Sequence, residues 1–130
     1  MKCDYTFLLI DDNTIDQLVT CQLIKKSAGT HMHNINIAGN GREGLKWLNN
    51  NLNLLDKSLV ILLDINMPEM NGFQFLAEYE SLPENLKRET QIFMLSSTLN
   101  NEDIDRINQN NHVRSLLSKP LSIQKLEQYI

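Results

Sequence analysis

With 130 residues and a mass of 15.0 kDa, the chain is long enough for one domain and too short for two. A content of 42% hydrophobic and 22% charged residues excludes a disordered protein, and the net charge of −4 argues against binding to nucleic acid through its phosphates. The longest aliphatic run, Leu59–Leu63, is too short for a secretory signal or a membrane span. We therefore expect a cytoplasmic protein with no nucleic-acid or membrane partner.

Short apolar runs alternate along the chain with longer amphipathic segments, which is the pattern of βα units around a parallel sheet. Four runs are largely apolar, as strands buried on both faces are, and one alternates with asparagine, as an edge strand does. The predicted strands are, in chain order, Tyr5–Ile10, Ile35–Ala38, Leu59–Leu63, Ile92–Leu95 and Val113–Leu117.

The segments between these runs have helical spacing. Ile15, Leu18, Val19 and Leu23 fall on one face of a first helix, which Gly29 could end. A second helix is predicted after Gly41, and a third from Phe73 to Leu82, before Pro83. A fourth is predicted over Glu102–Asn110 and a fifth over Leu121–Ile130. The pattern therefore predicts an α/β fold of five βα units.

Polar residues follow four of the predicted strands directly. In an open parallel sheet the ligand site lies beyond the carboxyl ends of the strands. We therefore expect these residues to gather at one edge of the sheet. They are Asp11-Asp12, Asp64, Ser96-Ser97 and Lys119-Pro120.

Three carboxylates gathered at one edge need a compensating cation. At 4 Å and an effective dielectric constant near 20, each pair of like charges costs about 4 kcal/mol. An oxygen-rich site with few protein ligands suits Mg²⁺, and together with a hydroxyl (Ser96) and an ammonium (Lys119) it makes a phosphoryl-transfer set. Taken one at a time, the same Asp and Ser residues would serve as helix caps. Capping does not explain Asp64-Ile-Asn-Met-Pro or the Lys-Pro that ends the last strand.

Five motifs in register resemble the receiver domain of two-component response regulators, and the match spans the whole chain. The resemblance implies a doubly wound, five-stranded parallel sheet in the CheY-like order 2-1-3-4-5. It also implies one receiver domain over residues 1–130 with no output domain, since the residues after Pro120 suffice for one helix only. The motifs are Leu8–Asn13, Ala38–Leu45, Asp64–Gly72, Met94–Ser97 and Lys119-Pro120.

The resemblance assigns the metal and acceptor roles residue by residue. Asp64 would be the phosphoacceptor and a Mg²⁺ ligand. Asp12 would ligate Mg²⁺ directly, Asp11 largely through water, and the backbone carbonyl of Asn66 would be a further ligand. In the family, the residues two past the acceptor and two past the hydroxyl residue, here Asn66 and Thr98, tune hydrolysis of the phosphoryl group.

Three further positions take roles from the resemblance. Ser96 would hydrogen-bond the phosphoryl oxygens, and Lys119 would pair with the phosphoryl group. The peptide bond between Lys119 and Pro120 is expected to be cis. The family's signalling aromatic falls three residues before the lysine, where this chain has Leu116. We therefore expect output to pass by another route, such as the helix Glu102–Asn110 and the loop before it.

A protein of this family takes its phosphoryl group from a sensor histidine kinase or a histidine phosphotransfer protein. It then signals by changed protein binding or relays the group onward, and it is not a conventional enzyme. The resemblance implies donor contacts at Ile15 and Pro120, and a weak dimer through Glu102–Asn110 and Leu121–Ile130. The sequence does not identify the downstream target.

Two alternatives stay open on the sequence. A degenerate receiver would act only as an interaction module that needs no phosphorylation. A phosphoaspartyl hydrolase of the haloacid-dehalogenase type would also use a strand-end Asp. That class needs a second Asp two residues later, where this chain has Asn66, and a capping insertion for which 130 residues leave no room.

Overall fold

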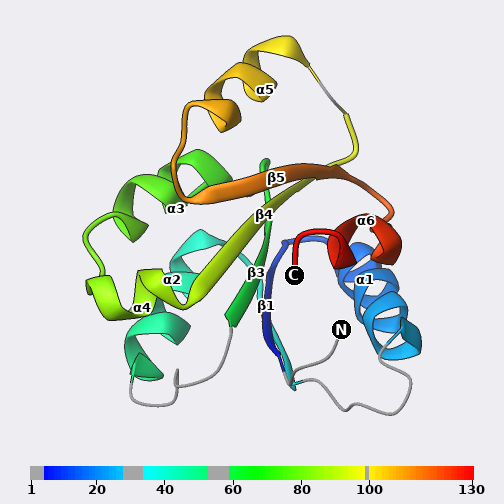
Figure 1. Cartoon of the computed structure of the whole chain (residues 1–130), viewed down its shortest axis with the longest axis horizontal. Helices are drawn as coiled ribbons and strands as arrows, with labels where there is room; N and C mark the ends of the chain where they lie inside the picture. The colour runs from blue at the N-terminus through cyan, green and yellow to red at the C-terminus, as the bar shows by residue number, and fades with distance from the viewer. Residues whose placement is uncertain (1–4, 28–33, 53–58, 99) are drawn as a thin grey trace.

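A computed structural model describes residues 5–27, 34–52, 59–98 and 100–130, which form one five-stranded sheet with helices on both faces (Figure 1). The strands are β1 (Thr6–Ile10), β2 (Asn34–Ala38), β3 (Leu59–Asp64), β4 (Thr90–Ser96) and β5 (Val113–Ser118). The helices are α1 (Thr14–Ser27), α2 (Gly41–Asn50), α3 (Gly72–Tyr79), α4 (Glu84–Arg88), α5 (Asn101–Asn108) and α6 (Ile123–Glu127). All neighbouring strands are parallel in the order β2-β1-β3-β4-β5, which confirms the predicted fold and strand order.

The sheet separates two hydrophobic cores, because successive residues of a strand point to opposite faces. On β1, Leu8 and Ile10 join the core beneath α2, α3 and α5, whereas Phe7 and Leu9 join the core beneath α1 and α6. Figure 1 shows α1 and α6 on one side of the sheet and α2, α3 and α4 on the other. Each fully buried aliphatic or aromatic side chain stabilises the fold by about 1.5–3 kcal/mol relative to its exposed state.

The predicted helices are present, with one addition. The short helix α4 follows Pro83 and was not predicted, because five residues with one buried side chain, Leu86, give no detectable periodicity. α3 ends at Tyr79, earlier than the predicted Leu82. Among the described residues, no helix has both the length and the apolar character needed to cross a membrane.

α1 is confirmed as a helix, but the apolar face that predicts it lies mostly in solvent. Ile15 is 72% exposed, Leu18 64% and Val19 42%. The helix contributes the buried Ile24 to the core on this side of the sheet, and Cys21 and Leu23 pack against it partly buried. Gly29, the predicted end of the helix, lies outside the described residues. Ile15, Leu18 and Val19 therefore form an apolar strip on α1 that the described part of the fold leaves exposed.

Gly72 begins α3 against the backbone of β3, and its N–H donates to the carbonyl of Ile65 at 2.8 Å. A Cβ at this position would lie 2.7 Å from the carbonyl oxygen of Asp64. At Gly41, which begins α2, a Cβ would meet the side chain of Met70, with its Cγ nearest at 2.8 Å. A methionine side chain can move aside, and a strand backbone cannot do so cheaply.

We expect Gly72→Ala to lower the free energy of unfolding by about 2 kcal/mol, because overpacking against a fixed neighbour costs roughly 1–3 kcal/mol. Gly41→Ala is the matched control and should cost less than about 1 kcal/mol. Urea unfolding of both variants measures the difference. Equal losses would contradict the claim that contact with the β3 backbone excludes a side chain at Gly72.

Candidate functional site

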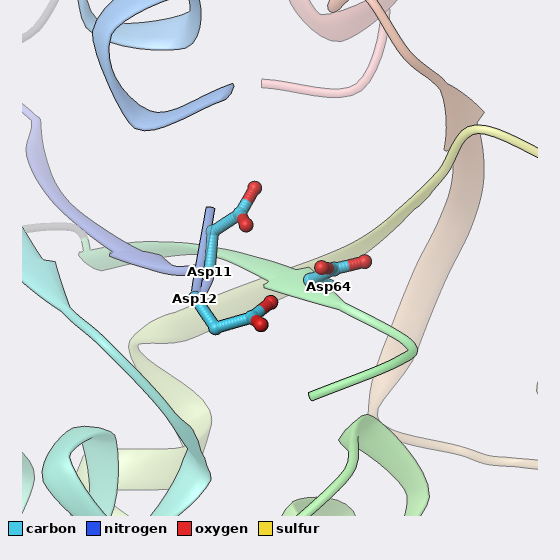
Figure 2. Close-up of side chains that lie close together, drawn as sticks. All are labelled: Asp11, Asp12 and Asp64. Atoms are coloured by element: carbon cyan, nitrogen blue, oxygen red, sulfur yellow. The ribbon is translucent and has the colours of Figure 1, made fainter. Parts of the chain in front are cut away.

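The carboxyl edge of the sheet brings three carboxylates together. The backbone N–H of Asp11 donates to the carbonyl of Ala38 at 3.0 Å, which extends the pairing of β1 with β2 by one residue. Asp64 is the last residue of β3 and pairs with Leu95 of β4. Carboxylate oxygens of Asp11, Asp12 and Asp64 all lie within 4.8 Å of one another (Figure 2). The clustering expected from the strand ends is therefore observed.

The three carboxylates differ in exposure. Asp11 is completely buried, Asp64 is 8% exposed, and Asp12 faces solvent. Burial is the main reason that the pKa of Asp64 rises from its ordinary value of 3.8 to about 6. The charges of Asp11 and Asp12 raise this pKa further, while the ammonium of Lys119 opposes the rise. Ionised Asp64 is therefore held in a site that favours the approach of a cation.

Lys119 supplies the ammonium at this edge. Its backbone N–H donates to the carbonyl of Ser96 at 2.9 Å, and its bond to Pro120 is cis, as the resemblance implied. Its Nζ lies 3.0 Å from Oδ2 of Asp11 and 3.4 Å from Oδ2 of Asp64. Burial alone would lower the pKa of Lys119, but the carboxylates around the ammonium outweigh this and raise it. Lys119 therefore stays charged among these carboxylates.

Asp16 and Gln17, in the first turns of α1, also reach the site, and sequence reasoning missed both. Oδ2 of Asp16 lies 2.9 Å from Nζ of Lys119, and Nε2 of Gln17 donates to the backbone carbonyl of Asp11 at 2.6 Å. The available signal was weak: Asp16 is an acidic residue in the first turn of the helix that follows Asp11 and Asp12. Two polar residues of α1 thus fasten this helix to the pocket.

The hydroxyl of Ser96 is engaged within its own loop. Ser96 is buried at the end of β4, and its Oγ donates to the backbone carbonyl of Thr98 while accepting from the Thr98 N–H at 3.2 Å. A hydroxyl has one proton to donate. Ser96 must therefore release the Thr98 carbonyl before it can donate to any ligand at Asp64.

The other predicted positions surround the pocket. Asn66 is exposed in the loop after β3, and Thr98 and Pro120 are exposed in the loops after β4 and β5. Leu116 is half-buried on β5 and packs with Phe73 against the core beneath α3 and α5. Leu116 therefore lies between β5 and the helices α3 and α5.

The donor set suits a small, hard divalent cation. Mg²⁺ binds oxygen at about 2.0–2.1 Å in octahedral geometry, so two of its ligands lie roughly 3–4 Å apart. Oxygens within 4.8 Å reach that spacing after a small inward movement. Asp12, which is exposed, has the freedom to make that movement, whereas Asp11 is fixed by its bond to the N–H of Asn13 at 2.9 Å.

Comparisons with known proteins agree with this geometry. Residues 7–130 match the model of the response regulator receiver domain. A response regulator receiver protein from Dyadobacter fermentans is 31% identical, with a TM-score of 0.84 over 95% of this chain and 93% of its own. A two-component response regulator from Cytophaga hutchinsonii is 24% identical and shares the fold, with a TM-score of 0.88 over 98% of this chain and 95% of its own.

Two further proteins are similar to this chain. The Mn²⁺-bound form of response regulator Rcp1 is 26% identical, with a TM-score of 0.70 over 95% of this chain and 86% of its own. The sensor histidine kinase CheAY of Helicobacter pylori is 37% identical over 75 residues. That match covers 58% of this chain and 8% of the kinase.

We expect Asp64→Asn to stabilise the metal-free protein at neutral pH. With a pKa of about 6 in the folded state against 3.8 in an ordinary carboxyl, the ionised group destabilises the native state above pH 6. This penalty decreases as the pH falls from about 6 to 3.8, because over this interval the native state binds a proton that the unfolded state does not yet bind. The gain should be about 1–3 kcal/mol at pH 7 and close to zero below about pH 4.

Urea unfolding in chelator across this pH range measures the gain. Asp105→Asn, on the exposed side of α5, makes the same change in charge and should alter stability by less than about 0.5 kcal/mol. A pH-independent gain for Asp64→Asn would contradict the buried-charge explanation.

Proposed function

We propose, because the chain belongs to the response regulator receiver domain family, that Asp64 accepts a phosphoryl group from a phosphohistidine donor in a Mg²⁺-dependent reaction. Receiver domains are phosphoacceptor signalling modules rather than conventional enzymes. The phosphorylated chain then signals through changed protein binding or passes the group onward. One observation carries the proposal: the Asp64 carboxylate ends β3 beside Asp11 and Asp12 and within 3.4 Å of the Lys119 ammonium.

The chemistry follows from these positions. A carboxylate oxygen of Asp64 attacks phosphorus, the O–P bond forms, and the P–N bond to the donor histidine breaks. The imidazole nitrogen leaves with the bonding electrons and takes up a proton. Asp11, Asp12 and Asp64, with the main-chain carbonyl of Asn66, would hold Mg²⁺, which when bound neutralises charge on the phosphoryl oxygens.

Two side chains complete the acceptor site. The ammonium of Lys119 pairs with the incoming phosphoryl group, since it already lies between Asp11 and Asp64. The hydroxyl of Ser96 exchanges the Thr98 carbonyl for a phosphoryl oxygen. That exchange moves the loop after β4 and changes the surface that a partner meets.

The exposed strip on α1 is where we place the phosphohistidine donor. Ile15, Leu18 and Val19 are exposed on a helix that begins two residues after Asp12, and Pro120 is exposed beyond β5 at the same edge of the sheet. An exposed apolar strip beside a polar pocket is typical of a protein-docking surface. Receiver domains partner histidine kinases, and one relative of this chain is a sensor histidine kinase.

We place the output on the side formed by α5, β5 and α6. Leu116 has neither a ring nor a hydroxyl with which to follow Ser96, so the loop around Thr98 carries the change directly to α5, which begins at Asn101. Asn66 and Thr98 flank the acceptor and would tune the lifetime of the phosphoryl group. A weak dimer would use α5 and α6.

We expect the wild-type chain to gain the mass of one phosphoryl group when incubated with acetyl phosphate and Mg²⁺. Asp64→Asn should gain none while keeping its circular dichroism spectrum, because an amide is not a nucleophile of this kind. Chelation of the metal should also abolish the gain in the wild type, and Asp105→Asn should label normally. If the wild type stays unmodified although it binds metal, the chain is an interaction module instead.

We expect Leu18→Gln to slow phosphorylation by a histidine kinase that labels the wild-type chain, by about three- to tenfold, because the variant removes apolar contact area but keeps helix propensity. Its labelling by acetyl phosphate should be unchanged, since the pocket is intact. Ile37→Thr, at a half-exposed position on the edge strand β2, is the matched control. Equal slowing with both donors would place the defect in the pocket and contradict docking on α1.

A further inference from the structure

We infer that Asp16 is a positioning residue that keeps Lys119 beside the pocket when a divalent cation engages Asp11 and Asp64. The inference rests on the proposed function, because it concerns the same metal-binding carboxylates. It assigns a task to a residue that the site motifs do not include.

The ammonium of Lys119 is shared among three carboxylates. Its Nζ lies 2.9 Å from Asp16, 3.0 Å from Asp11 and 3.4 Å from Asp64. Of these three, Asp16 alone lies outside the group of carboxylates that could hold a metal in the described part of the chain. An ammonium has three protons to donate and accepts none, so it can bond all three oxygens at once.

The position of Asp16 is fixed by the start of α1. Its N–H donates to the side chain of Asn13 at 3.0 Å, which caps the helix. Its carboxylate lies in the first helical turn, where the helix dipole favours negative charge. Gln17, the next residue, donates to the backbone carbonyl of Asp11 and holds the same turn against β1. The backbone of Asp16 is therefore held in place, and its carboxylate, although 39% exposed, already contacts Lys119 at 2.9 Å.

Without Asp16, a divalent cation and the ammonium would compete for the same two carboxylates. Each oxygen that bonds a cation holds Lys119 less strongly, and the two positive charges repel at this distance. Asp16 would let Lys119, whose side chain is 12% exposed in this structure, give up part of its contact with Asp11 and Asp64 and still stay paired. The pocket can then hold both positive charges that phosphoryl transfer requires.

A double-mutant cycle tests the inference by amide NMR titration of the metal-free protein with MgCl₂. Asp16→Asn should weaken Mg²⁺ affinity about fivefold when Lys119 is present, within the range of couplings between residues in contact. In the Lys119→Gln background the same change should weaken it by less than about twofold, because no ammonium is left to compete. Glu43→Gln, in the first turn of α2, removes one negative charge elsewhere and should also stay within about twofold.

A second measurement keeps Lys119 in place. In protein labelled with [¹⁵N]lysine and saturated with Mg²⁺, the slowly exchanging ammonium signal of Lys119 should persist in the wild type and vanish in Asp16→Asn. Equal weakening by Asp16→Asn in both backgrounds, or a persistent ammonium signal in that variant, would overturn the inference. A wild-type chain that binds no Mg²⁺ would instead overturn the proposed function.

Discussion

The ammonium of Lys119 is the group on which the pocket depends. A parallel sheet places the ends of its strands at one edge, and here that edge collects Asp11, Asp12 and Asp64, with Asp16 beside them. Two of these carboxylates are buried, and buried charges are stable only when they are paired. One ammonium cannot balance four carboxylates, so the folded pocket keeps an excess of negative charge. That excess gives the site its affinity for a further cation.

Helix α1 joins the pocket to the exposed apolar strip on which we place the donor. Its first turns bind the pocket through Asp16 and Gln17, while its outer face presents Leu18 and its apolar neighbours to solvent. Both features belong to one rigid element. A protein that docks on the outer face therefore meets a surface whose distance from Asp64 is set by hydrogen bonds and not by a mobile loop. This arrangement suits a transfer reaction, which depends on close alignment of two reacting atoms.

The apolar runs predicted the parallel sheet, and parallel topology predicted the gathering of the strand-end residues, whereas the strand order came from the resemblance to receiver domains. It did not predict the contact of Asp16 with Lys119, which joins residues 103 positions apart and depends on how α1 is tilted over the sheet. The spacing of Ile15 and Leu18 identified a helix but not what covers its apolar face, since periodicity is the same for buried and exposed strips. The state of the Ser96 hydroxyl depends on a side-chain rotamer, which no sequence pattern encodes.

The complete burial of β3 has a consequence for how the sheet finds its alignment. All six residues of β3 are buried, and five of them are aliphatic. If β3 shifted by one residue relative to its neighbours, the aliphatic side chains on its two faces would change places at little hydrophobic cost. The terminal carboxylate breaks this degeneracy. A slip in one direction would draw the charge of Asp64 into hydrocarbon, and a slip in the other would place the side chain of Leu63 among the polar groups of the pocket. Asp64, which brings the end of β3 into the pocket, thus also fixes the register of this strand in the sheet.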